Sequence, residues 1–378
     1  MICKSITLSS FRNIGLETLS FSDGVNVLWG DNAQGKSNML EGIYFFARGR
    51  SFRGAKEKEL IRFKESAAQL SLDFLRDGDK YPITLAATIP TEGRKTLCRN
   101  GARLSGSKEM IGQFRAVLFC PAHLTLVSGG PALRRSFMDI ALSQLYPAYL
   151  DSLSKYNRAL LQRNALIKKA REDGGRKLYD TYIWETYAQQ MAEHGADIFT
   201  RRLQYMNELS ASVEELFQSM TDGKEKPCIS YRSFTSSDAD ELYEAGKTKL
   251  FEALTQNIDR EITMGSTLYG AHKDDIAVRL NGKEAKIYAS QGQQRSLALA
   301  MKLSEGEISR KISGEYPVFL LDDVLSELDS HRRAFVMQSL SERQLIVTSC
   351  EPDIFRAMGS GARLFHIKDG ALLETDGQ

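Results

Sequence analysis

The chain has 378 residues, of which 42% are hydrophobic and 26% charged, and its formal net charge is +2. This composition is that of an ordinary globular protein with a large core, and the length favours two domains. The sequence pI of about 8.1 falls short of the strongly basic composition of a dedicated nucleic-acid-binding domain. Any contact with DNA would therefore need basic residues that are concentrated locally.

The N-terminal residues, MICKS, begin like a strand and lack the apolar core of a signal peptide. No apolar run approaches the length of a membrane span. The five cysteines are scattered, odd in number and without C-x-x-C spacing. We therefore expect a cytoplasmic protein with reduced thiols, and neither a disulfide framework nor a cysteine metal site.

Residues 30–37, GDNAQGKS, fit the pattern G-x-x-x-x-G-K-[ST] without a mismatch. A strand-like run at 25–29 precedes them, and residues 38–46 have helical spacing. In such a loop, glycines turn backbone N–H groups towards phosphate oxygens, at a helix N-terminus that favours negative charge. We predict that Lys36 reaches the β- and γ-phosphates and that Ser37 ligates Mg²⁺. The predicted nucleotide-binding residues here are Gly30, Asp31, Asn32, Ala33, Gln34, Gly35, Lys36, Ser37 and Asn38. The alternative is a Gly-rich turn that matches by chance.

Short strands dominate the chain up to about residue 130, with a hairpin turn predicted at Asn100-Gly101. From residue 131 to about 217 the apolar positions follow a helical period, with a break at Pro147, a turn at 173–175 and a pause near Gly195. This pattern favours an antiparallel helical arm inserted into a strand-rich domain. The alternative is that these helices complete a single core. A helix at 242–262, a strand at 276–280 and a hairpin turn at Asn281-Gly282 follow.

Residues 317–323, PVFLLDD, form a predicted buried strand that ends in two carboxylates. We expect Asp322 to lie beside Ser37 and hold Mg²⁺. Asp323 would then orient or deprotonate the attacking water. The alternative is an acidic strand end without a catalytic role.

Residues 290–295, SQGQQR, open a predicted helix with Ser290 as its N-cap. Gly292 would leave the backbone N–H groups of the first turn accessible to an anion. On this evidence alone, an ordinary capped helix is an equal alternative.

The order of these motifs resembles the ABC-type ATPase heads of the chromosome-maintenance and DNA-repair class. The resemblance implies an α/β fold, a P-loop ATPase head with a mixed sheet and an inserted short α-helical arm. In that class the S-x-G-x-x signature acts on the nucleotide of a partner subunit, which implies roles for Ser290, Gln291, Gly292 and Gln293. Residues 326–329 resemble its D-loop. Arg12 and Asn13 lie in a segment, 11–13, that resembles the one against the adenine.

Within that class the chain resembles the RecF family of bacterial recombination mediators, over about residues 5–340. The segments that carry this resemblance are 11–13, 49–53, 131–139, 270–275 and 290–303. It implies an ATP- and Mg²⁺-dependent homodimer that clamps gapped or junction DNA, helps to load recombinase, and works with the mediators RecR and RecO. It also implies three segments: 1–130 and 264–378 as the two parts of the ATPase domain, and 131–263 as the arm.

Two features depart from the related ATPases. Thr348, Ser349 and Cys350 stand where a switch histidine is common, and no Q-loop glutamine is evident, with Gln113 and the segment at Pro121 as candidates. Because an aspartate at position 323 has a shorter reach than the glutamate of transporter ATPases, we expect slow hydrolysis. The competing functions are a transporter ATPase subunit and an ATP-switched structural protein that does not turn over.

Two groups of basic residues are candidates for sequence-independent phosphate contacts. One follows the phosphate loop and comprises Arg48, Arg50, Arg53, Lys56 and Lys58. The other lies on the arm and comprises Lys155, Arg158, Arg163, Lys168, Lys169, Arg171, Arg176 and Lys177. The alternative for the arm is a solvated helix face. Arg134 and Arg135 could serve a dimer contact or a structural ion pair, and His272 could be a satisfied buried polar residue.

Overall fold

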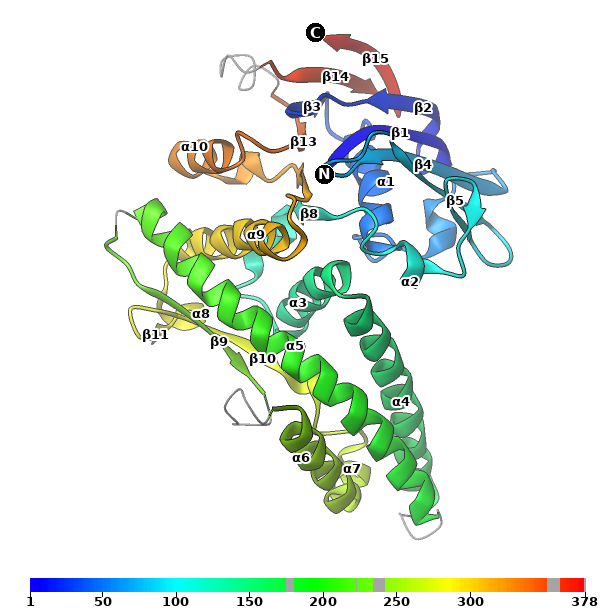
Figure 1. Ribbon diagram of the computed structural model, residues 1–378, viewed down its shortest axis with the longest axis vertical. Coiled ribbons are helices and arrows are strands. Elements are labelled where there is room, and N and C mark those ends of the chain that lie inside the picture. The colour runs from blue at the N-terminus through cyan, green and yellow to red at the C-terminus, as the bar shows by residue number, and fades with distance from the viewer. Residues whose placement is uncertain (175–179, 222, 234–241, 352–360, 377–378) are drawn as a thin grey trace. The chain divides into compact units, whose positions relative to one another are not determined.

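The computed structural model describes residues 1–174, 180–221, 223–233, 242–351 and 361–376 (Figure 1). The chain divides into two compact units. The first, the phosphate-loop unit, comprises residues 1–125, 216–224 and 290–378, and the second, the helical unit, comprises residues 126–215 and 225–289. Within the described ranges, no helix is long and apolar enough to cross a membrane.

The central sheet of the phosphate-loop unit has the strand order β15-β14-β3-β13-β12-β8. Its strands are β3 (Val25–Trp29), β8 (Ala116–Phe119), β12 (Val318–Asp322), β13 (Leu345–Ser349), β14 (Arg363–Lys368) and β15 (Ala371–Asp376). All neighbours are parallel except β15, which joins β14 antiparallel. Every residue of β8 and β12 is buried. Their continuous apolar runs are those of strands covered on both faces, and the strand predicted at 317–323 is confirmed.

A second, antiparallel sheet in this unit has the order β2-β1-β4-β5-β6-β7. Its strands are β1 (Ile2–Phe11), β2 (Ile14–Ser20), β4 (Ala67–Leu75), β5 (Ile83–Pro90), β6 (Thr96–Arg99) and β7 (Ala102–Arg103). The predicted hairpin turn between the last two is confirmed. Asn100 and Gly101 have φ of 49° and 80°, the pair of positive values that a two-residue type I′ turn requires.

Helix α1 (Lys36–Arg48) contacts both sheets of the phosphate-loop unit: β1 and β4 of the antiparallel sheet, and β8, β12 and β13 of the central sheet. Ten of its 13 residues are buried, so it is buried on most sides instead of on one apolar stripe. A Cβ at Gly42 would lie 2.6 Å from Leu8 Cδ2, so the glycine lets α1 approach β1. The other helical segments in the described part of this unit are η1 (Glu57–Leu60), α2 (Ser107–Met110), η2 (Pro121–Thr125), α9 (Gln291–Ser313), η6 (Leu325–Glu327) and α10 (Ser330–Ser339).

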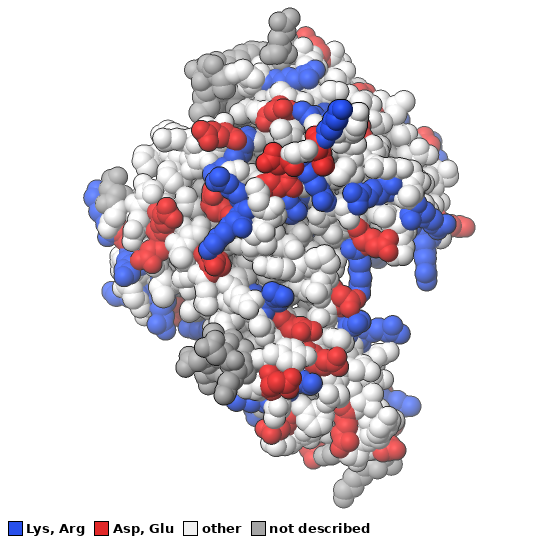
Figure 2. Space-filling view, viewed as in Figure 1, with Lys and Arg blue, Asp and Glu red and all other residues white. Residues whose placement is uncertain are grey.

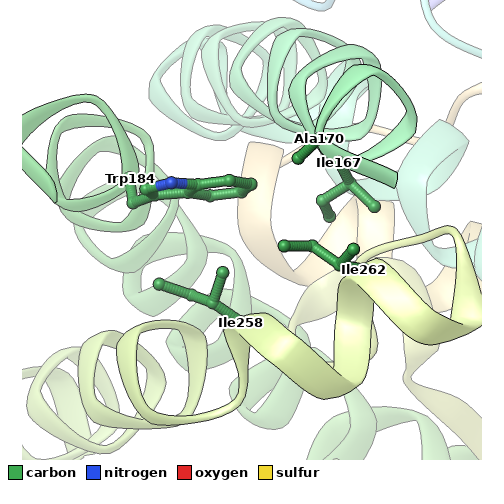
Figure 3. Close-up of a cluster of buried hydrophobic side chains, with 5 residues drawn as sticks. All are labelled: Ile167, Ala170, Trp184, Ile258 and Ile262. Atoms are coloured by element: carbon green, nitrogen blue, oxygen red, sulfur yellow. The ribbon is translucent and has the colours of Figure 1, made fainter. Parts of the chain in front are cut away.

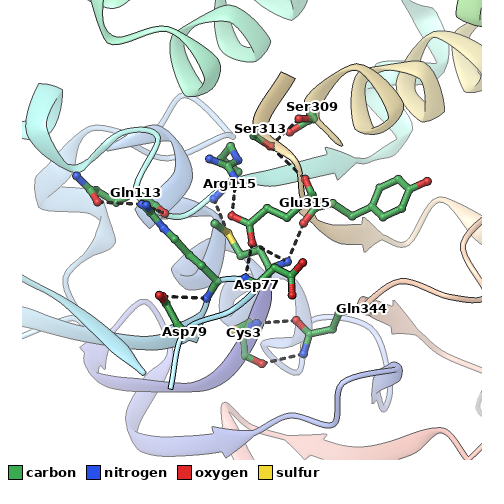
Figure 4. Close-up of polar contacts among 12 residues, drawn as sticks. Cys3, Asp77, Asp79, Gln113, Arg115, Ser309, Ser313, Glu315 and Gln344 are labelled. Carbon is green, nitrogen blue, oxygen red and sulfur yellow. Dashed lines mark hydrogen bonds and ion pairs between the residues drawn. The ribbon is translucent and has the colours of Figure 1, made fainter. Parts of the chain in front are cut away.

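Polar contacts link the two sheets near the N-terminus (Figure 4). Glu315 accepts hydrogen bonds from Arg115 Nη2 at 2.6 Å and from the Asp77 amide at 2.8 Å. Gln344, just before β13, exchanges two bonds of 2.7 Å with the backbone of Cys3 on β1. Gln344 thus satisfies the backbone N–H and C=O of the buried Cys3 in β1.

In its described residues, the helical unit contains five longer helices and a small sheet of order β11-β10-β9. The helices are α3 (Pro131–Leu145), α4 (Pro147–Glu172), α5 (Thr181–Thr221, its last turns counted with the first unit), α6 (Leu242–Gln256) and α7 (Ile258–Met264). The sheet and its short helices are β9 (Pro227–Arg232), η5 (Ala271–Lys273), β10 (Asp275–Leu280), β11 (Lys283–Glu284) and α8 (Ala285–Tyr288). The predicted break at Pro147 is confirmed, because α4 begins there.

One core cluster of the helical unit joins α4, α5 and α7 (Figure 3). Its members pack against one another and are at most 8% exposed. They are Ile167 and Ala170 of α4, Trp184 of α5, and Ile258 and Ile262 of α7. The apolar face predicted for the arm helices therefore closes on other helices of the same unit.

Two sequence-based expectations differ from the structure. The pause predicted near Gly195 is wrong, because α5 runs through this residue. A Cβ there would lie 2.6 Å from Leu250 Cδ2 and 3.3 Å from Tyr156 Cε2, so close packing is what requires the glycine. The boundary expected between the arm and the second part of the ATPase domain, after residue 263, also differs. Residues 264–289 belong to the helical unit, because β10 pairs with β9 and packs against α3. The turn predicted at 173–175 extends beyond the described residues.

Candidate nucleotide-binding site

The loop of residues 30–37 lies between β3 and α1, as predicted from its pattern. Gly30, Ala33 and Gly35 have φ of 146°, 64° and 107°, which curl the loop in a way that glycine permits. A Cβ would lie 2.3 Å from the Ile367 carbonyl oxygen at Gly30, and 2.9 Å from the Asn13 amide at Gly35. Both glycines are therefore required by neighbouring atoms as well as by the backbone angle.

The side chain of Lys36 lies against the curve of this loop. Its ammonium donates to the carbonyl oxygens of Gly30 at 2.6 Å and Asp31 at 2.8 Å, and lies 3.4 Å from Cys350 Sγ. Only 5% of the residue is exposed. The structure thus brings the predicted phosphate-binding lysine to the loop, and its contact with a phosphate stays a prediction.

Two other segments support the loop. Asn38 of α1 donates to Asn13 Oδ1 at 2.8 Å. The turn after β14 meets Gln34, whose carbonyl and side-chain oxygens accept bonds from the Gly370 and Asp369 amides at 2.8 and 2.6 Å. The structure therefore joins Asn13, predicted to lie near the adenine, to the phosphate loop itself.

Arg12 has a different setting from its neighbour Asn13. Its guanidinium forms two hydrogen bonds, of 2.9 and 3.0 Å, with the carboxylate of Glu41 in α1, and a third, of 2.9 Å, with the Glu59 carbonyl. Ser51 also bonds the Glu41 carboxylate. Glu41 was missed by pattern reasoning, although an acidic residue inside an apolar helix was a usable sign of a buried ion pair. Any contact of Arg12 with adenine stays a prediction.

Asp322 ends β12 at the same edge of the central sheet as the loop. In the parallel register Asp322 is level with Thr348 of β13, and Thr348 is level with Leu28 of β3. Helix α1, whose second residue is Ser37, packs against β12 and β13. Carboxylate and hydroxyl oxygens are suitable ligands for Mg²⁺, so these residues fit the predicted ion. Their direct proximity stays a prediction, as does the role of Asp323.

The segment at residues 290–295 opens helix α9, and the predicted N-cap is confirmed. Ser290 Oγ accepts from the Gln293 amide at 3.2 Å, while the Ser290 amide donates to Gln293 Oε1 at 2.7 Å, which is a capping box. Ser290 and Gln291 are exposed. A Cβ at Gly292 would lie 3.0 Å from Arg332 Nη2, so a larger residue would crowd the neighbouring helix α10.

The segment that resembles a D-loop lies beside this helix. Arg295 donates to the Glu327 carbonyl at 3.0 Å. Arg332 Nε donates to Ser296 Oγ at 2.7 Å, and Asp329 caps α10 through the Arg332 amide at 2.9 Å. The structure thus groups the predicted signature and D-loop segments within one unit.

The two Q-loop candidates lie at opposite ends of β8. Gln113 precedes the strand and bonds Arg76 at 2.9 and 3.0 Å, so it is at the edge away from Asp322. The segment after β8 is at the same edge as Asp322, since β8 and β12 are parallel. There the Cys120 amide donates to His123 Nδ1 at 3.2 Å. Burial, with the nearby charges of Lys302 and Arg48, holds the pKa of His123 well below its usual range, so the imidazole is neutral near pH 7.

The basic residues proposed for phosphate contacts differ in exposure and in their carboxylate partners. Arg163 is fully buried and paired with Glu261 at 2.5 Å, so its assignment to a DNA surface is wrong. Lys155 pairs with Asp151 at 2.8 Å. On the face shown in Figure 2, basic and acidic side chains are mixed. Lys168, Lys169 and Arg171 are exposed, and Arg176 and Lys177 lie outside the described residues.

The segments 131–139 and 270–275 meet in the helical unit. Arg134 forms two bonds with the Asp275 carboxylate, of 2.7 and 2.8 Å, and Arg135 donates to the Asp274 carbonyl at 2.8 Å. For the buried Arg134, the structural ion pair is therefore the correct alternative. His272 lies 2.8 Å from Tyr156 OH, which confirms that it is a satisfied polar residue.

Comparison with known proteins defines the class first. A family model described as the RecF/RecN/SMC N terminal domain matches residues 2–372. The structure of the recombination mediator protein RecF-ATPrS has a TM-score of 0.90 and 34% identity, covering 98% of this chain and 97% of that one. The structure of RecF-ATP has a TM-score of 0.87 and 33% identity, covering 100% of this chain and 97% of that one. An Smc head bound to a ScpA winged-helix domain, 16% identical with a TM-score of 0.56, shares the fold. The fold is that of an ABC-type ATPase head with a helical arm region.

Curated relatives define the family. The DNA replication and repair protein RecF of Clostridium novyi (strain NT) is 35% identical over 374 residues, covering 98% of this chain and 99% of the relative. That of Agathobacter rectalis is 36% identical over 380 residues, covering all of both. The chain belongs to the RecF family.

Proposed function

We propose that this protein binds ATP and DNA in recombinational repair and replication, and that ATP closes two copies on DNA as a clamp. Its relatives are named as DNA replication and repair proteins, and solved RecF structures are named with ATP and ATPrS. The observation that carries the proposal is the loop of residues 30–37, at the same sheet edge as Asp322 and Asp323.

Within one copy, each site residue has a proposed role. Lys36 would exchange its bonds to loop carbonyls for bonds to the β- and γ-phosphates. Ser37 and Asp322 would hold Mg²⁺, which when bound neutralises phosphate charge. Asp323 would orient the attacking water or accept its proton. Its short side chain supports slow hydrolysis, suited to a switch that releases DNA, and a turnover of hundreds per second with DNA would contradict this.

The signature would act on the nucleotide of a second copy. Ser290 and Gln291 are exposed at the N-terminus of α9, where helix dipole and backbone N–H groups favour a phosphate. ATP would then become part of the dimer interface. By analogy with the RecFOR pathway named for the solved relatives, we propose gaps and duplex–single-strand junctions as DNA targets, recombinase loading as the outcome, and RecR and RecO as partners.

The experiment that tests the clamp is a measurement of molecular size with and without ATP. Wild type and a Ser154→Arg control, at an exposed serine of α4, should dimerise with ATP. Ser290→Arg should remain monomeric while still binding ATP. A wild-type protein that stays monomeric with ATP and DNA would refute the clamp. Phosphate release by wild type but not by Asp323→Asn would distinguish an ATPase from a switch without turnover.

A further inference from the structure

We propose that Thr348 is a positioning residue that fixes the orientations of Asp322 and Asp323 for metal binding and hydrolysis. The inference rests on the proposed function of the site, and it assigns a role to the strand between the phosphate loop and the acid pair. Thr348 is the fourth residue of β13 and only 1% exposed.

The hydroxyl of Thr348 joins the two aspartates. The Asp323 amide donates to Thr348 Oγ1 at 2.9 Å, and Thr348 Oγ1 lies 3.1 Å from Asp322 Oδ1. An amide N–H can only donate, so the hydroxyl accepts this bond, and it donates its own proton to the Asp322 carboxylate oxygen. Both directions of the bridge are therefore determined. Because Asp322 is only 7% exposed, water has little access to compete for the hydrogen bond between Thr348 and Asp322. Consecutive hydrogen bonds of this kind strengthen one another.

This bridge sets the direction of both carboxylates. The bond to Oδ1 restricts rotation of the Asp322 carboxylate and leaves Oδ2 for another ligand. Asp323 has a φ of 55°, a left-handed conformation that non-glycine residues adopt only where neighbouring contacts hold it. Its amide is bonded to Thr348, so the bond helps to hold this backbone conformation directly after β12. Without the hydroxyl, the amide would lose its acceptor and the turn would lose a stabilising contact.

The same strand end also reaches the phosphate loop. Two residues after Thr348, Cys350 Sγ lies 3.4 Å from Lys36 Nζ and 3.1 Å from Asn32 Oδ1. Since β13 lies between β3 and β12, its end contacts both halves of the site. Thr348 is thus placed to fix the acid pair relative to the loop.

The test compares Thr348→Val, which keeps the shape of the side chain, with Thr348→Ser, which keeps the hydroxyl. ATP affinity is measured in EDTA and across a Mg²⁺ titration, together with phosphate release. For Thr348→Val we expect half-saturation at a Mg²⁺ concentration about 10- to 100-fold higher, the usual effect of losing a group that orients a metal ligand. ATP affinity in EDTA should change little, and Thr348→Ser should resemble wild type. A Thr348→Val protein with wild-type Mg²⁺ dependence would overturn the proposal.

The matched control is Thr267→Val in the helical unit. Thr267 is also 1% exposed, and its hydroxyl bonds Asn164 Oδ1 at 2.9 Å. This variant should lower the melting temperature without changing the Mg²⁺ dependence, which separates lost stability from lost positioning. If Thr348→Val does not fold, Thr348→Cys replaces it, because a thiol is a weak donor and acceptor, and the same outcomes apply.

Failure of this inference differs from failure of the proposed function. If wild type shows no Mg²⁺-dependent ATP binding, the proposed function fails and Thr348 has no acid pair to position. If wild type requires Mg²⁺ and Thr348→Val behaves identically, only the role of Thr348 fails.

Discussion

At Gly30 the phosphate loop packs against the backbone of β14. A Cβ there would meet the Ile367 carbonyl oxygen at 2.3 Å, and the φ of 146° disfavours any other residue. We expect Gly30→Ala to weaken ATP binding more than tenfold and to destabilise the protein by about 1–3 kcal/mol, as overpacking does. The control is Gly24→Ala, where no atom lies within 4 Å of the added Cβ. Calorimetric titration and thermal unfolding would measure both effects, and equal ATP affinities would contradict the prediction.

His272 makes stability depend on pH. Burial lowers its pKa from 6.5 to about 4. Between these values the unfolded chain binds the proton and the folded chain does not, so stability falls as the pH falls from about 6.5 to 4. From pH 7 to pH 5 this histidine should account for a loss of about 2 kcal/mol. Urea unfolding of His272→Gln should show a correspondingly smaller loss of stability between pH 7 and pH 5. The control His331→Gln, at an exposed histidine, should lose as much stability as wild type over this range.

At the scale of elements, the sequence predicts those whose signal is local. The strand–loop–helix at 25–48, the hairpin turns at Asn100 and Asn281, and the N-cap at Ser290 depend on glycine, asparagine and serine chemistry, and the structure has all of them. Gly195 was misinterpreted because a helix-breaking residue and a close-packing residue look the same without the partner helix. The support of the loop by Gly370 was missed, although Asp369-Gly370 between two apolar runs is a usable hairpin signal.

The candidate site also combines features with a local sequence signal and features that depend on tertiary structure. The phosphate loop and acid pair are recognisable from short patterns, whereas the bridge through Thr348 depends on strand order. Nothing local in residues 345–350 indicates that β13 lies between β3 and β12. The sequence could not show it, because the contact joins positions about 25 residues apart through tertiary pairing.

The buried pair of Arg163 and Glu261 ties α4 to α7 inside the helical unit. Both are fully buried; Arg163 also donates to the Leu254 carbonyl at 2.7 Å and lies over the Trp184 ring at 5.6 Å. Removing one partner leaves a buried charge, so Glu261→Leu or Arg163→Met should destabilise the protein by about 3–5 kcal/mol.

The double variant tests the cause of that loss. Because Arg163→Met with Glu261→Leu leaves no buried charge, it should recover much of the stability that either single change removes. Urea unfolding of the four proteins gives the coupling energy directly. Additive losses would show that the pair contributes through packing alone.

At the scale of the whole molecule, a net charge of +2 and a mixed surface on the face in Figure 2 argue that DNA contacts, if present, are local. Three exposed basic residues at the end of α4, Lys168, Lys169 and Arg171, are the described arm residues best suited to phosphate contacts. Lys168 lies 4.0 Å from Glu172, which is a weak pair at the surface.

Reversing these three charges to glutamate should weaken DNA binding and reduce the slope of log affinity against log salt by about 2–3, because each lost phosphate contact removes close to one released counterion. The control reverses Lys226, Arg279 and Lys283, three exposed basic residues in or next to the small sheet of the same unit. It changes the net charge equally, so it corrects for long-range attraction. Affinity for gapped DNA, measured across a salt series with ATP, distinguishes the outcomes. An unchanged slope in the α4 variant would exclude this helix end as a DNA surface, while leaving the ATP-driven dimer to its own test.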